Sequence, residues 1–316
     1  MAAGSLGFVG GIALALLAVF EVGPVWCDQA AAVVISTTIV ASLAARTGGR
    51  SWIFGGMAAV IGLAAVWSDF GPLRAGAASL TAVATGVLAV MLTVPAPRFR
   101  HTLREVAMAT WVSLWGAFGV IGFRPQVAMD AFDYTALGLA FALTLALVYR
   151  LGAGFNSLGR RGLIVLVGGA IALVLVITYA ELLRRYGPPG LLERVFDAVR
   201  WHRDNLGAVP RPTVAFIGVP ALIWGTHMRA RRRQGWWVTA FGVCLPVRFA
   251  TILVNPETGW LEAGLIVLYS LPPGIVLGYV AIQLDLALTG SRGRRARSDE
   301  QARAVRPEPR RLHALL

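Results

Sequence analysis

Long apolar runs separated by short polar segments make up most of this chain. The runs lie at residues 6–26, 30–45, 52–68, 76–96, 105–123, 134–151, 162–183, 212–228, 236–254 and 261–285. Each run approaches the roughly 20 residues that a helix needs to cross a hydrocarbon layer of about 30 Å. The pattern predicts an all-α fold, a polytopic membrane bundle of about ten transmembrane helices over residues 1–290.

The amino-acid composition is that of a membrane protein. Apolar residues make up 57% of the chain and charged residues only 14%, whereas soluble domains carry about 25% charged residues. The net charge of +13 comes from arginine alone, because the 29 basic residues include no lysine. This usage, together with abundant Ala, Gly and Val, indicates a GC-rich bacterial genome. Since the arginines gather in particular loops, they indicate membrane topology, and we expect no nucleic-acid partner.

The arginines concentrate on one side of the predicted membrane. With the N-terminus in the cytoplasm, the short outer loops contain only Arg74 and Arg124. The 12 arginines of the short inner loops are Arg46, Arg50, Arg98, Arg100, Arg104, Arg150, Arg160, Arg161, Arg229, Arg231, Arg232 and Arg233. The acidic residues Asp28, Asp69, Asp130, Asp133 and Glu257 fall on the outer side. Because cytoplasmic loops retain arginine, we expect both termini in the cytoplasm of a multi-pass protein of the bacterial plasma membrane.

Two segments lie outside the predicted spans. The long outer connection at residues 187–211 repeats apolar residues on one side, at Leu191, Leu192, Val195, Phe196 and Val199. This spacing predicts an amphipathic helix, either on the outer membrane surface or packed on the bundle. Residues 291–316 are polar and rich in arginine, and they predict a disordered cytoplasmic tail. Such a tail either contacts anionic lipid or only marks the end of the last span.

Prolines recur near the middle of the last three spans. They are Pro220, Pro246 and the pair Pro272 and Pro273. Proline removes a backbone donor, so each helix should kink or break there and leave polar backbone groups that lipid cannot satisfy. Interrupted helices near the midplane are typical of substrate sites in secondary transporters. The alternative is that these prolines only shape the bundle.

Arg248, two residues beyond Pro246, is the basic residue placed deepest in any predicted span. A charge at that depth requires a partner or water. The candidate partners are Glu21, Glu181 and Glu262, with Glu181 the first choice, and Tyr179 and Thr178 as further hydrogen-bonding groups. One hypothesis is that Arg248 binds an anionic substrate together with these acids and the four prolines. The other is that Arg248 forms a permanent ion pair that fixes helix packing.

The remaining polar residues form no recognisable cofactor or metal site. The four histidines do not offer two ring ligands at one depth for haem. Cys27 and Cys244 predict neither a disulfide nor a zinc site. His202 beside Asp204 is the one acid–base candidate, and a solvated helix face is the commoner explanation of such a pair. We therefore expect no cofactor and no metal.

Three functional hypotheses follow. Ten helices in 316 residues with both ends inside resemble the drug/metabolite transporter architecture of two five-helix halves, in length and topology. The halves of this chain are not similar to one another, and the midplane prolines lie in the second half alone, so the family is not assigned. The leading hypothesis is a permease or flippase-like carrier for a small or lipid-linked anionic molecule, bound between spans eight and ten. The alternatives are a non-catalytic membrane subunit or scaffold with a membrane protein partner, and a membrane-embedded enzyme.

Overall fold

The computed structural model describes residues 2–19, 22, 24, 26–151, 155–303 and 308–315, and no strand occurs among them. The helices are α1 (Ala2–Val19), α2 (Cys27–Arg46), α3 (Ser51–Trp67), α4 (Gly71–Met91), α5 (Phe99–Gly122), α6 (Met129–Arg150), α7 (Phe155–Tyr186), α8 (Pro189–Leu206), α9 (Val219–Arg229), α10 (Gly235–Phe241), α11 (Cys244–Ala250) and α12 (Trp260–Arg303). A π-helical turn, η1 (Thr213–Gly218), precedes α9, and a 3-10 turn, η2 (Ile252–Val254), follows α11. The all-helical prediction is confirmed.

Six segments are long and apolar enough to cross a membrane. They are α2, α4, α5, α6, the segment Gly235–Val254 and the segment Trp260–Leu288 of α12. Each of the ten apolar runs overlaps a helix or a pair of consecutive short helices. The length and apolarity of the described helices therefore support a multi-pass membrane protein, whereas the count of ten spans stays a prediction.

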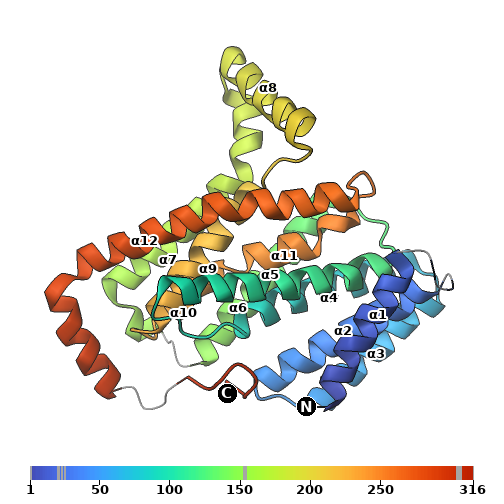
Figure 1. Cartoon of the computed structure of the whole chain (residues 1–316), viewed down its shortest axis with the longest axis horizontal. Coiled ribbons are helices and arrows are strands. Elements are labelled where there is room, and N and C mark those ends of the chain that lie inside the picture. The colour runs from blue at the N-terminus through green and yellow to red at the C-terminus, as the bar shows by residue number, and fades with distance from the viewer. Residues whose placement is uncertain are drawn as a thin grey trace.

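The amphipathic connection forms a helix that stands away from the bundle. Helix α8 begins after Pro188 and ends at Gly207, whose φ of +75° closes the last turn through a hydrogen bond from its N–H to the Arg203 carbonyl. Glycine adopts this left-handed conformation without steric cost, which is why the helix stops there. Figure 1 shows α8 and the adjoining end of α7 projecting from the bundle, and α8 contains no buried residue. Its predicted position on the membrane surface stays a prediction.

The segment from α10 to η2 lies at the centre of the molecule. Every residue from Gly235 to Val254 is buried. Helix α10 packs on α6, α7 and α9, and α11 packs on α4, α5, α6 and η1. Because other helices surround this segment, its backbone groups and side chains face protein throughout.

The helical backbone is irregular just before two of the three proline positions. The π-helical turn η1 ends just before Pro220, and the chain turns at Gly242 and Val243 between α10 and α11, just before Pro246. Helix α12, by contrast, continues through Pro272 and Pro273. The predicted break is therefore absent from α12, whereas the alternative, a kink at the proline pair, stays a prediction. Its packing along η1 and α9 holds this helix together despite the missing backbone donors.

Part of the C-terminal segment makes contacts that the predicted disordered tail does not include. Helix α12 extends to Arg303, and residues 308–315, which we call the strap, lie against the ends of α2, α5 and α9. Figure 1 shows this end of the chain in red beneath the bundle, near the end of α2. The tail composition predicts disorder because it has few apolar residues, but the strap is held by hydrogen bonds and ion pairs to buried arginines.

Helix α5 approaches α2 so closely that a glycine is required at the contact. A Cβ added at Gly122 would lie 2.3 Å from the Asp28 carbonyl oxygen and 3.0 Å from the Ala32 Cβ. We expect Gly122→Ala to lower the free energy of unfolding by about 2 kcal/mol, because the helices must move apart. Gly138→Ala on α6 is the control, since a Cβ there meets nothing within 4 Å, and it should be neutral or stabilising by about 0.5 kcal/mol. Thermal unfolding of the purified protein in detergent tests this difference, and equal effects would contradict the tight contact.

Candidate functional site

Two arginines share one carboxylate at the end of the bundle formed by the start of α6 and the end of α11. Asp133 lies one turn into α6, Arg248 lies on α11, and Arg211 lies in the segment that precedes η1. The Asp133 Oδ2 is 2.7 Å from Arg248 Nη1 and 3.3 Å from Arg211 Nη1. We call Asp133, Arg211 and Arg248 the outer cluster.

The outer cluster is largely withdrawn from solvent and carries a surplus positive charge. The side chains of Arg248, Asp133 and Arg211 are 8%, 16% and 25% exposed. Two guanidinium groups face one carboxylate, so one positive charge has no counter-ion within the cluster. Arg248 Nε and Asp133 Oδ1 are buried without a hydrogen-bond partner among the described residues. Buried charges of this kind need compensation, which an anion or a rearranged pairing would supply.

Neighbouring groups connect the outer cluster to other helices. The Arg248 guanidinium carbon lies 5.4 Å from the centre of the Tyr134 ring, a distance typical of cation–π contacts. The backbone N–H of Arg211 donates to Ser270 Oγ at 2.9 Å, and that hydroxyl donates to the Ile266 carbonyl at 2.6 Å. Ser270 lies two residues before Pro272, so α12 reaches the cluster close to its proline pair. The cluster therefore joins α6, α11 and α12.

Among the described residues, the carboxylate that pairs with Arg248 is Asp133, which the sequence did not suggest. Glu262 pairs with Arg203 at 3.3 Å, because α8 ends beside the start of α12. Glu21 lies outside the described residues, and so does the side chain of Glu181. Asp133 can pair with Arg248 because it lies inside a helix. Helix α6 begins at Met129, five residues before the predicted start of the span at Tyr134. The sequence signal for Asp133 was a second acidic residue three positions after Asp130, on the same face of one helix.

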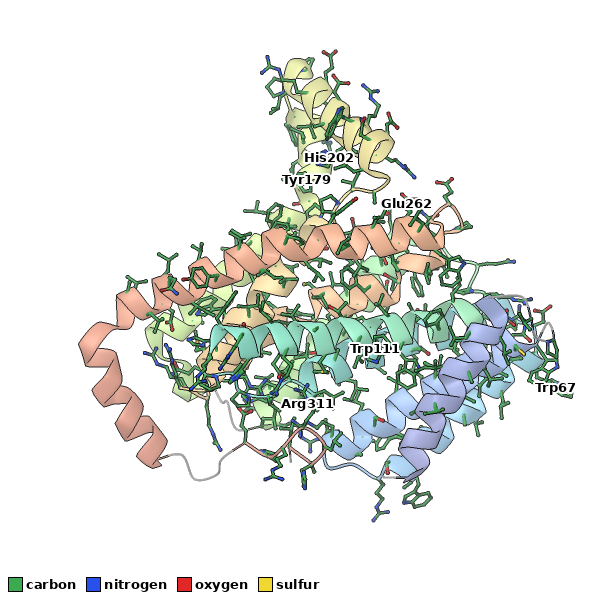
Figure 2. The ribbon with its side chains drawn as sticks, in the orientation of Figure 1. Trp67, Trp111, Tyr179, His202, Glu262 and Arg311 are labelled. Carbon is green, nitrogen blue, oxygen red and sulfur yellow. The ribbon has the colours of Figure 1, made fainter. Side chains whose placement is uncertain are left out.

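The projecting helices hold the other polar candidates away from the outer cluster. Figure 2 labels Tyr179 on α7 and His202 on α8, both in the part that stands out from the bundle. Thr178 Oγ1 donates to the Val174 carbonyl at 2.8 Å, within its own helix. His202 Nδ1 lies 3.1 Å from the Ala198 carbonyl oxygen, also within its own helix. Among the residues searched, no group of three His, Cys, Asp or Glu side chains could hold a metal ion.

A second buried polar cluster lies at the opposite end of the bundle, where the strap docks. Arg229 has a fully buried side chain, and its guanidinium carbon lies 3.4 Å from the centre of the Trp236 ring. It donates to the Thr93 hydroxyl at 2.6 Å and to the Thr93 carbonyl at 3.1 Å. Its Nε and Nη2 donate to the two carboxylate oxygens of Glu308, the first residue of the strap. This two-fold contact is the geometry in which arginine binds carboxylates most strongly.

Arg46 and Glu105 anchor the rest of the strap. Arg46 Nε donates to the Met91 carbonyl at 2.8 Å, and its Nη1 donates to the carbonyls of Arg310 and His313. The Leu315 N–H in turn donates to the Arg46 carbonyl at 2.7 Å, which satisfies an acceptor at the end of α2.

Glu105 is fully buried. It accepts from the Val94 N–H at 3.0 Å and pairs with Arg311 at 2.7 Å. The sequence identifies the arginines at this end only as topology signals. It does not identify Glu105 or Glu308 as the carboxylates that pair with them. The one available signal was that Glu105 is acidic in an otherwise arginine-rich segment.

Known proteins do not identify this chain. Comparison with protein-family models, with curated proteins and with solved structures finds no match. Two polar clusters and the buried segment from Gly235 to Val254 between them are therefore the features that bear on function.

Proposed function

We propose that this chain is a multi-pass membrane carrier, of permease or flippase type, for a small or lipid-linked anionic molecule. The two arginines of the outer cluster are its anion-binding groups. Asp133 is the internal carboxylate that occupies them when no substrate is bound. Substrate and Asp133 would then alternate as partners of Arg248 and Arg211, so the ion pair forms part of the transport cycle.

The observation that carries this proposal is the ratio of two guanidiniums to one carboxylate beside an interrupted, buried helix. A purely structural pair would be expected to balance its charges, since an unmatched buried charge is costly. An irregular turn at Gly242 and Val243 separates α10 from α11. Pro246 follows this turn on α11, and Arg248 lies two residues after Pro246. Irregular helical segments line the substrate sites of many secondary transporters. Here the irregular turn lies inside the bundle, and Arg248 lies beyond it on α11, toward the end that holds the outer cluster.

The proposal includes ten spans with both termini in the cytoplasm of a bacterial plasma membrane. The contacts of the described residues support a chain that crosses from one end of the bundle to the other with successive helices. Helices α2, α4 and α9 end near the strap, and α5 begins there. The ends joined by the Arg124–Asp28 and Arg248–Asp133 ion pairs lie at the other side. The arginine-rich loops gather at the strap end, which the excess of inner arginine assigns to the cytoplasm.

A membrane subunit or scaffold is the second candidate. Helices α7 and α8 leave large apolar side chains exposed, among them Val174, Leu175, Leu191 and Trp201. A partner protein packed on this projecting pair would cover them. Co-purification of a stable stoichiometric partner, with the outer cluster remaining closed, would favour this candidate over the carrier.

Access of water to the outer cluster tests the carrier. Cys244 lies four residues before Arg248 on α11 and is fully buried. The other cysteine, Cys27, is 2% exposed. In a Cys27→Ser protein reconstituted in liposomes, an impermeant methanethiosulfonate reagent should label Cys244 slowly, because α11 opens during transport. Asp133→Asn should raise the labelling rate about tenfold, since it weakens the closing ion pairs by about 1.4 kcal/mol.

Asp130→Asn is the matched control, because Asp130 lies one turn earlier on α6 and is exposed. It should leave the labelling rate unchanged. Inorganic phosphate should slow labelling of the Cys27→Ser protein more than chloride at equal ionic strength. If Cys244 stays unlabelled in both aspartate variants while it reacts fully after denaturation, the carrier is excluded.

A further inference from the structure

An open pocket lies between the strap and the bundle, at the end opposite to the outer cluster. Its volume is about 620 Å³, and its lining residues are Val94, Pro95, Arg104, Met108, Glu308, Pro309, Arg310 and Arg311. The strap forms one whole wall, so the pocket exists because residues 308–311 are docked. Figure 2 labels Arg311 at this position, beneath the bundle and away from Glu262. We call this the strap pocket.

The strap pocket combines an apolar floor with a cationic rim. Val94, Pro95 and Met108 supply the floor. Arg311 binds the buried Glu105 through Nη2, whereas its Nη1 is buried without a hydrogen-bond partner among the described residues. The Arg104 side chain is 65% exposed and makes only a long contact of 3.3 Å to Glu105. Arg104 therefore has exposed donors for a ligand, and the Arg311 side chain, which is 26% exposed, lies beside it on the rim.

The charges around the strap pocket are unbalanced. Five arginines belong to the pocket or to the contacts that hold its wall, and they are Arg46, Arg104, Arg229, Arg310 and Arg311. Among the described residues two carboxylates oppose them, and both are engaged already, Glu105 by Arg311 and Glu308 by Arg229. The surplus of three positive charges beside an apolar floor suits an anion that carries an apolar part.

We propose that the strap pocket binds the phosphate group of an anionic amphiphile. Arg104 and Arg311 bind the phosphate oxygens, because guanidinium groups match phosphate geometry with paired hydrogen bonds. The apolar part of the ligand lies on Val94, Pro95 and Met108. The arginine-rich end of a membrane bundle is the level at which lipid headgroups lie, so the ligand is the headgroup of an anionic phospholipid or a soluble molecule with the same phosphate group. This site is separate from the proposed carrier site and does not depend on it.

The strap couples the pocket to the fold. A ligand that contacts Arg311 and Pro309 also stabilises the docked strap, because it binds only when that wall is present. Binding of the phosphate group is therefore expected to protect the strap from proteolysis, as well as to raise the unfolding temperature.

The test uses the full chain purified in a neutral detergent. Native mass spectrometry counts retained phosphatidylglycerol and phosphatidylcholine, and thermal unfolding is followed with and without inorganic phosphate. The double variant Arg104→Gln, Arg311→Gln should bind phosphatidylglycerol about 25-fold more weakly, at about five-fold for each arginine. Arg98→Gln, Arg100→Gln is the matched control, since both arginines are exposed near the start of α5 and do not line the pocket.

A second variant separates loss of binding from loss of the strap. Met108→Trp fills the apolar floor without changing any charge, and it should abolish retention of phosphatidylglycerol while the strap remains protected from protease. Preferential retention of phosphatidylglycerol supports the lipid source. Stabilisation by inorganic phosphate that the double variant loses, without lipid preference, supports the soluble source, because phosphate bound at the outer cluster would still stabilise that variant. The proposal is overturned if the two lipids bind equally and phosphate has no effect, or if the double variant behaves like its arginine control.

Discussion

Asp133→Ala is expected to lower the free energy of unfolding by about 4 kcal/mol, because it leaves two buried guanidiniums without their shared carboxylate. Asp133 Oδ2 lies 2.7 Å from Arg248 and 3.3 Å from Arg211. Removing one partner of a buried pair costs more than the pair itself contributes, since the remaining charge stays desolvated. Chemical or thermal unfolding of the purified protein in detergent measures the change.

The shared carboxylate also predicts an asymmetry between the partners. Arg248→Met should cost less than half as much as Asp133→Ala, because Asp133 keeps Arg211 as a partner. Asp130→Ala, one turn earlier on α6 and exposed, should change stability by less than about 0.5 kcal/mol. Equal effects of the two aspartate variants, or a larger effect of Arg248→Met, would contradict the geometry of the outer cluster.

Glu308→Ala is expected to lower the free energy of unfolding by about 3 kcal/mol. Arg229 is fully buried, and Glu308 is the carboxylate that pairs with it through both oxygens. Without this carboxylate the strap loses its first anchor, and protease should cleave residues 308–315 more readily. Limited proteolysis with detection of the C-terminal fragment, together with thermal unfolding, measures both changes.

A double variant distinguishes the loss of charge pairing from the loss of packing. Adding Arg229→Met to Glu308→Ala should restore about half of the lost stability, because no unpaired charge is then buried. Glu193→Ala on α8, where the side chain is exposed, is the matched single control and should be neutral. If Glu308→Ala and Glu193→Ala leave the strap equally protected from protease, the ion pair does not hold the strap.

The helices could be predicted because each satisfies its backbone hydrogen bonds within one segment. A run of apolar residues long enough to cross lipid must be helical, whatever its neighbours are. The amphipathic period of Leu191, Phe196 and Val199 likewise predicted α8, which extends from Pro189 to Leu206. Pro246 predicted an irregular backbone, and the chain turns between α10 and α11 just before it. These features depend on residues near one another in the chain.

The partners of the buried charges could not be predicted in the same way. A buried Arg248 requires a carboxylate partner. With Asp133 included, four acidic residues lie at a similar predicted depth in the membrane. The sequence around α11 does not distinguish among them. Asp133 is 115 positions away from Arg248, and it was placed in a loop because the apolar run begins after it. The choice depends on α6 packing beside α11, a contact between distant segments.

The sequence alone predicted a helical, multi-pass membrane protein and the gathering of its arginines at alternate loops, because hydrophobicity and positional charge act residue by residue. Tertiary structure alone decided which charges meet. The strap is the clearest case: its composition predicts disorder, yet Arg46 and Arg229 leave donors at the ends of two distant helices that its carbonyls and Glu308 satisfy. Such a match exists only after the helices have assembled, because the donors come from segments far apart in the chain.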